Sequence, residues 1–219
     1  LGQGALDDTL GAVSVLNVGR ALAKHKGQFK RTLRVVNFST EETHTGGSRY
    51  YAAKHKDELN KHICMINCDG FARRGEASMS TNNDELLRYL RKVAKEEDIP
   101  VHVSEGFKGR TGADQSAFYL AGVPTTGFGG SPEPGVAPRG PVGGRYPDHT
   151  AADTADKVNV TRVRTATIMF AQILISMLNE EERFAHPVPK EDIMRDVDET
   201  EKAVHACRGK CVGYRQPFG

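Results

Sequence analysis

The sequence has no excess of either charge and no long apolar run. Thirty Lys and Arg residues are balanced by 28 Asp and Glu residues among 219, which gives a formal net charge of +2 at pH 7. This balance, without a basic stripe interleaved with aromatic residues, argues against binding to nucleic acid or to an anionic membrane surface. The most apolar run, residues 168–178, is too short to span a bilayer and indicates a core helix. We therefore expect a globular chain without a membrane span.

Cysteine is also scarce, and its four positions fall in two different settings. Cys64 and Cys68 lie in a strand-like run and are expected to be buried thiols. Cys207 and Cys211 lie in a polar tail, where they form either a small disulfide loop or, less favoured, a zinc knuckle with His205 as the one further ligand nearby. Neither pair decides between a reducing and an oxidising compartment.

The first residues have no pattern typical of a secretory signal peptide, and residues 4–9 already have the composition of a functional loop. We therefore expect the chain to be an excerpt of a longer protein. Its preceding part is expected to be an N-terminal segment of the same polypeptide or a separate chain.

Apolar segments of strand length alternate with segments that have the periodicity of helices. Strands are expected at 31–38, 62–68, 100–103 and 123–128, while 71–80 is expected to be irregular or a short edge strand with Arg73 exposed. Helices are expected near 9–24, 48–60, 84–97, 113–121, 158–179 and 190–205. This alternation predicts an α/β three-layer sandwich with a mostly parallel central sheet flanked by helices. We expect a main domain at 1–180 and a charged C-terminal extension at 181–219.

Acidic residues follow two of the expected strands. Glu41 and Glu42 come after 31–38, and Asp69 comes at the end of 62–68. Ligand sites of such sheets gather at the carboxyl ends of strands, so these side chains are expected to face one another. Adjacent carboxylates repel unless a cation or a proton lies between them. The alternatives are a solvated Glu-Glu pair and a turn role for Asp69.

Carboxylates and an imidazole from separate loops are the ligands that a hydrolytic zinc site requires. Two zinc ions further require a carboxylate that bridges them and a spare carboxylate for proton transfer. Each candidate also has an ordinary interpretation, a helix cap for Asp7, Asp8 or Asp114 and a loop position for the histidine. The candidate set is Asp7, Glu41, Glu42, Asp69 and His149.

These residues lie in motifs that resemble the M28 family of zinc-dependent exopeptidases. The motifs are Gly4–Gly11, Glu41-Glu42 followed by Gly47–Tyr51, Asn67–Asp69, Gly112–Asp114 and His149–Thr154. They occur in the family's order over about residues 1–180. The resemblance implies a metallo-exopeptidase that hydrolyses a terminal bond of a peptide substrate, with an aminopeptidase expected before a carboxypeptidase or dipeptidase. It also somewhat favours a secreted or vesicular protein.

The resemblance implies a role for each metal ligand. Asp7 would bridge two zinc ions, and a cis peptide bond to Asp8 would hold it in place. Glu42 and His149 would complete the coordination of one zinc ion. Asp69 would belong to the other ion.

The resemblance also implies the proton-transfer group and the residues behind the ligands. Glu41 would be the general base, which takes a proton from water and later passes it to the leaving amine. Asp114 would support the ligands, and Asp153 would brace the His149 loop. The Gly- and Pro-rich segment 129–148 is expected to form a wall or lid of the site. An Arg110 contact with a substrate carboxylate is a weaker expectation.

Two departures from the family pattern leave alternatives open. The family supplies its second zinc ion with a histidine from a strand and loop that this chain does not contain. We favour the alternative in which the segment that carries this histidine belongs elsewhere in the protein. In the second alternative, one zinc ion is bound by Asp7, Glu42 and His149, as in the glutaminyl-cyclase branch. In the third, the domain is an inactive binding domain. Gln115 stands where many members have a histidine.

Overall fold

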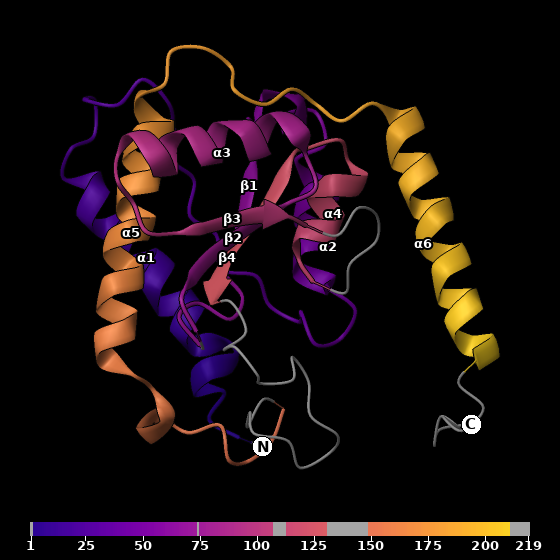
Figure 1. The fold of residues 1–219 in the computed structure, drawn as a ribbon, viewed down its shortest axis with the longest axis horizontal. Coiled ribbons are helices and arrows are strands. Elements are labelled where there is room, and N and C mark those ends of the chain that lie inside the picture. The colour runs from indigo at the N-terminus through magenta and orange to yellow at the C-terminus, as the bar shows by residue number, and fades with distance from the viewer. Residues whose placement is uncertain (1, 74, 107–112, 131–148, 211–219) are drawn as a thin grey trace.

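A four-stranded sheet lies between two groups of helices in the computed structural model, which describes residues 2–73, 75–106, 113–130 and 149–210 (Figure 1). The strands are β1 (Met65–Asn67), β2 (Ala77–Thr81), β3 (His102–Glu105) and β4 (Thr125–Gly130), in the order β1-β4-β2-β3. The pairs β1–β4 and β2–β3 are parallel, and β2–β4 is antiparallel. The predicted α/β sandwich is therefore confirmed. Residues 77–81 form an inner strand rather than an edge strand, because they pair on both sides.

The helices form the two outer layers. On one face of the sheet, α1 (Leu10–Ala23), α3 (Asp84–Glu96) and α5 (Val160–Asn179) contribute to the larger hydrophobic core. On the other face, α2 (Gly46–Lys54) and α4 (Gln115–Leu120) contribute to a smaller core. Short helical turns precede α1, β1 and α5, at Ala5–Thr9, Leu59–Lys61 and Ala155–Lys157 respectively. None of the described helices has the length and apolar character that a bilayer crossing requires.

The amphipathic pattern of α3 shows how the sequence determines one helix of the larger core. Leu86, Leu90 and Val93 follow helical spacing and are buried, while the opposite face is charged. Asn83 begins the helix, and its side-chain oxygen accepts a hydrogen bond from Leu86 N at 2.8 Å. The predicted helix is therefore confirmed, and Asn83 is its N-cap.

The strand predicted at residues 31–38 is wrong. This segment is neither helix nor strand, because no neighbouring strand among the described residues pairs with its backbone. It begins beside the C-terminal end of α5, where the N–H groups of Lys30 and Arg31 donate to Leu178 O at 3.1 Å. It ends with Phe38 packed against the rings of Tyr51 and Phe118. The apolar sequence is therefore partly buried without a ladder.

The C-terminal extension returns to the main domain before it ends. Ala185 is fully buried, and Val188 N donates to Gly122 O at 2.8 Å. Tyr119 donates its hydroxyl to Asp196 on α6 (Lys190–Lys210), whose far end projects from the body of the molecule (Figure 1). The predicted domain boundary near residue 180 stays a prediction.

The cysteines are placed as far as the described residues extend. Cys64 and Cys68 are free thiols, half-buried and buried respectively, as predicted. Burial raises the pKa of Cys64 to about 12 and that of Cys68 higher still. Cys211 lies outside the described residues, so the Cys207–Cys211 disulfide stays a prediction.

Candidate metal centre

Three metal-binding side chains from distant parts of the chain converge on one point. His149 Nε2 lies 3.0 Å from Asp7 Oδ2 and 3.1 Å from Glu42 Oε1. One donor atom of each residue lies within 4.8 Å of the other two. The side chains of His149 and Glu42 are 68% and 60% exposed, so the group is open to solvent. Two carboxylates and one imidazole with an open side fit a catalytic zinc ion, which takes three protein ligands and leaves one position free.

A buried carboxylate joins the loops that carry two of these ligands. Asp153 is 1% exposed, and it accepts hydrogen bonds from Leu6 N at 2.8 Å and from Asp7 N at 3.0 Å. The family resemblance implies that Asp153 braces the His149 loop, and in the structure its carboxylate bonds to the turn that carries Asp7. Charge-assisted bonds of this kind hold a ligand in one orientation.

The next residue, Asp8, connects the same turn to the carboxyl end of β1. Its Oδ1 accepts a hydrogen bond from Gly70 N at 3.1 Å. The Asp7–Asp8 peptide bond is cis, as the family resemblance implies. A β-carbon at Gly11 would lie 2.2 Å from the carbonyl oxygen of Cys68, so only glycine allows α1 to approach this close.

Glu41 and Glu42 lie in a tight turn before α2. Thr45 N donates to Glu41 O at 2.9 Å, which closes the turn. A β-carbon at Gly47 would lie 2.5 Å from Ser39 O, which explains the glycine in the Gly47–Tyr51 motif. Three non-glycine residues of the turn have left-handed φ angles, namely Thr40 (61°), His44 (71°) and Thr45 (55°).

Mutual repulsion of carboxylates dominates the electrostatics of the site. Burial, followed by the charges of Asp69 and Glu42, raises the pKa of Glu41 to about 7. Burial and the charge of Asp69 likewise raise the pKa of Asp8 to about 7. Burial is also the largest cause of the raised pKa of Asp69, with the charge of Asp7 next. Such a cluster favours either a proton or a cation.

One basic side chain, Arg73, reaches this cluster, although the sequence predicts that it is exposed. Its side chain is only 16% exposed, and Nη1 lies 3.4 Å from Asp7 Oδ1. A β-carbon at Gly70 would lie 3.1 Å from Arg73 Nη2, so the guanidinium packs against the Asp69-Gly70 turn. Its charge opposes the rise in the pKa of Asp69. The two oxygens of Asp7 therefore face different partners, Oδ2 facing His149 and Oδ1 facing Arg73.

The remaining predicted site residues have mixed outcomes. Asp114 is buried and makes no cap bond to α4, and burial raises its pKa against the effect of a hydrogen bond with Ser48. Gln115 accepts a hydrogen bond from Asn67 Nδ2 at 2.7 Å, which connects α4 to the end of β1. Asp69 is not a member of the three-donor group. Arg110, Gly112 and residues 131–148 of the expected lid lie outside the described residues.

Comparison with known sequences gives one family. Residues 1–174 match the profile of Peptidase family M28. The chain is 30% identical over 125 residues to Carboxypeptidase Q of Mus musculus, a match that covers 57% of this chain and 26% of that protein. The chain therefore spans only about a quarter of the length of this curated relative.

Comparison with solved structures gives the same fold. The Peptidase M28 precursor from Shewanella amazonensis SB2B superposes with a TM-score of 0.68 at 26% identity, over 86% of this chain and 40% of that one. The zinc aminopeptidase BSAP from Bacillus subtilis superposes with a TM-score of 0.66 at 19% identity, over 88% of this chain and 46% of that one. In both cases more than half of the solved chain lies outside the match.

Proposed function

Because the chain belongs to peptidase family M28, we propose that it hydrolyses a terminal peptide bond with zinc held by Asp7, Glu42 and His149. The convergence of these three donors carries the proposal. The three donors come from separate segments of the chain. If Glu42 belonged to a solvated Glu-Glu pair and His149 were an ordinary loop histidine, their convergence on Asp7 would have no explanation. Since the chain spans only part of its relatives, the activity is proposed for the intact polypeptide.

The residues beside the ligands have distinct tasks in this proposal. Zinc, when bound, supplies Lewis-acid polarisation and lowers the pKa of a coordinated water. Glu41 would accept a proton from the attacking water as the water oxygen bonds to the scissile carbonyl carbon. As the C–N bond breaks, Glu41 donates the proton to the leaving amine nitrogen. Asp153 and Asp8 keep the Asp7 turn fixed through their bonds to backbone N–H groups.

The number of zinc ions depends on Asp7 Oδ1, the carboxylate oxygen that faces Arg73 and not His149. A second zinc ion bridged by Asp7 would use Oδ1 together with Asp69, and Arg73 now lies against that oxygen. We therefore propose one tightly bound ion at the three-donor group. A second ion binds more weakly, because it must displace a guanidinium and needs a further donor.

Replacing Arg73 with Ala is expected to make the second zinc ion bind more tightly. A unit charge about 4 Å from a divalent cation repels it by roughly 2 kcal/mol even in water, so the affinity should rise by at least about tenfold. Calorimetric titration of the metal-free protein measures both binding steps. Arg164→Ala, at an exposed position on α5, is the matched control. A second step that is unchanged in Arg73→Ala would refute the assignment.

The end of the peptide that is recognised is proposed from the charge of the site. The site contains five carboxylates, those of Glu41, Glu42, Asp7, Asp69 and Asp114. The basic side chains described beside them are Arg73 and His149. This excess of negative charge favours binding of a free α-amino group over a free carboxylate. We propose an aminopeptidase on this basis. The similarity to Carboxypeptidase Q supports a carboxypeptidase as the second candidate.

Peptides blocked at one end test both candidates. The intact zinc-loaded protein is expected to release amino acids from peptides with a free amino terminus and an amidated carboxyl terminus. Peptides with an acetylated amino terminus and a free carboxyl terminus should remain uncleaved. The reverse pattern would assign the carboxypeptidase, and no cleavage of either set would contradict the exopeptidase proposal.

A further inference from the structure

The C-terminal extension contains a buried carboxylate that is not among the residues of the metal centre. The buried carboxylates of the described chain are those of Asp114, Asp153 and Asp196. The first two lie beside the metal centre, whereas Asp196 is on α6 and is 5% exposed. Burial of a charge is costly unless the charge is hydrogen-bonded, and in some proteins such a group fixes one arrangement of the chain. The burial of Asp196 therefore indicates a specific contact.

The partner of Asp196 is Tyr119 on α4, which is 1% exposed. The tyrosine hydroxyl donates a hydrogen bond to Asp196 Oδ2. Burial and this bond raise the pKa of Tyr119 above its usual range, so the hydroxyl remains a donor at neutral pH. Arg195 Nη2 lies 3.4 Å from Asp196 Oδ1, but the arginine is 58% exposed and its shorter contact, at 2.7 Å, is with Asp192. The buried contact of Asp196 is therefore the one with α4.

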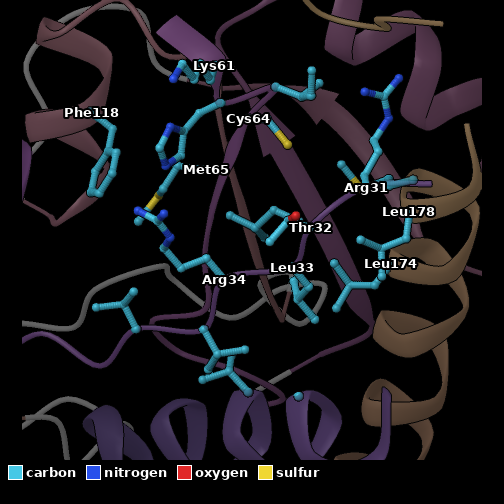
Figure 2. A pocket seen from close by; sticks show the side chains of 18 of the residues that line it. Arg31, Thr32, Leu33, Arg34, Lys61, Cys64, Met65, Phe118, Leu174 and Leu178 are labelled. Atoms are coloured by element: carbon cyan, nitrogen blue, oxygen red, sulfur yellow. The ribbon is translucent and has the colours of Figure 1, made fainter. Parts of the chain in front are cut away.

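The position of α4 depends on contacts with other elements. The helix has six residues, and helices of this length are not stable on their own in water. Its inner side packs through Phe118, whose ring centroid lies 5.8 Å from those of Phe38 and Tyr51. Figure 2 shows Phe118 and Met65 at a cavity of about 520 Å³ that both residues line. Apolar packing is not directional, so hydrogen bonds at the two ends of α4 determine its exact position.

The C-terminal extension holds the last turn of α4. Figure 1 shows the extension running from the end of α5 across the molecule to α6. On this path Val188 N donates to Gly122 O at 2.8 Å, just after the end of α4. Gly122 has a φ angle of 87°, which favours glycine at this turn. Together with the Tyr119–Asp196 bond, this contact fixes the end of α4 to the extension.

The other end of α4 follows Asp114, beside the metal centre. The carboxylate of Asp114 forms a hydrogen bond with the hydroxyl of Ser48, which is fully buried at the start of α2. The same hydroxyl lies 3.1 Å from Thr45 O, and Thr45 N donates to Glu41 O at 2.9 Å. The charge of Asp114 is also among the causes that raise the pKa of Glu41. Contacts therefore continue from α4 to the turn that carries Glu41.

We propose that Asp196 is a positioning residue, which through Tyr119 holds α4 where Asp114 supports the turn that carries Glu41. This inference rests on the proposed function, in which Glu41 transfers the proton. Tyr119 lies within residues 1–174, which match the family, and Asp196 lies after them. The extension acts on the peptidase site in this proposal, although it follows the region that matches the family.

Replacing Asp196 with Ala in the intact zinc-loaded protein is expected to lower kcat by about 10-fold. A misplacement of about 1 Å at a reacting group costs up to about 100-fold, and a loosened α4 shifts Glu41 by less. KM should change by less than about twofold, because the zinc ligands are not displaced. Asp196→Asn keeps an oxygen that accepts from Tyr119 and should retain at least about half of kcat. Tyr119→Phe should reproduce the loss, and the double variant should add little to it.

Glu85→Ala is the matched control, because it releases the same extension at a different helix. Glu85 Oε2, on α3, accepts a hydrogen bond from His186 N at 2.8 Å. This variant should unfold at a lower temperature but keep the kcat of the unchanged protein. Equal losses of kcat in Glu85→Ala and Asp196→Ala would indicate general loosening and would overturn the proposal. Unchanged kcat in both Asp196→Ala and Tyr119→Phe would overturn it as well.

Hydrogen exchange gives a second readout that does not depend on peptidase activity. In Asp196→Ala, the amides of residues 116–122 and 45–48 should exchange at least about 10-fold faster, and those of β2 should change little. Faster exchange that is confined to residues 116–122 would overturn the proposal, because the contacts would then end at α4. An unchanged protein that cleaves no peptide contradicts the proposed function, whereas activity that Asp196→Ala leaves intact contradicts only the positioning role.

Discussion

Replacing Glu41 with Gln is expected to lower kcat for a terminal peptide bond by about 10² to 10⁴-fold, the range that a positioned general acid–base group contributes. The amide keeps the size of the side chain but neither accepts nor donates the proton that must travel from water to the leaving amine. KM should change little, because Glu41 is not a member of the three-donor group. Steady-state kinetics of the intact zinc-loaded protein measure both constants.

Metal content separates this effect from loss of the site. Glu41→Gln should retain zinc at the stoichiometry of the unchanged protein, because Glu42 keeps its position at 3.1 Å from His149. Glu97→Gln, at an exposed position after α3, is the matched control and should keep full activity. If Glu41→Gln retains zinc and more than about a tenth of kcat, the base must be another group.

The division of roles between Glu41 and Glu42 is visible in the sequence only through the motif. Two adjacent carboxylates are chemically equivalent until a third residue distinguishes them. In the structure that residue is His149, which approaches Glu42 and thereby leaves Glu41 among other acids. The contacts with Asp153 and Asp8 follow the same logic, since the residue types were predictable but their backbone partners were not.

Two sequence-based predictions fail for the same physical reason. Residues 31–38 have the apolar, β-branched composition that is typical of a strand. A strand also requires a neighbouring strand to pair with, and none of the described strands pairs with this segment. A charged residue such as Arg73 is exposed by default, and its burial here depends on Asp7, which is remote in sequence. Local patterns therefore predicted the elements and the motifs, while contacts across the fold decided these two positions.

The carboxylate cluster should make the folded protein depend on its cation. Raised pKa values at Glu41, Asp8 and Asp69 mean that burial and repulsion oppose their ionised forms in the folded state. A divalent ion offsets that repulsion and binds the folded chain in preference to the unfolded one.

Zinc is expected to raise the melting temperature of the metal-free protein by roughly 5–10 °C when its free concentration is about 100 times Kd. Binding at that concentration stabilises the folded state by about 2.7 kcal/mol. For a domain of about 200 residues, each kcal/mol shifts the melting temperature by about 2–4 °C. Thermal unfolding followed by circular dichroism measures the shift, and a chelator should reverse it.

His149→Ala should remove most of this shift, since it takes away the one imidazole of the three-donor group. If the loss weakens zinc binding by about 100-fold, the same zinc concentration equals Kd and stabilises the fold by only about 0.4 kcal/mol. The expected shift is then about 1–2 °C. His25→Ala, at an exposed position after α1, is the control and should retain the full response. An undiminished response in His149→Ala would mean that the stabilising ion binds elsewhere, because the two remaining carboxylates, of Asp7 and Glu42, do not hold zinc alone at that concentration.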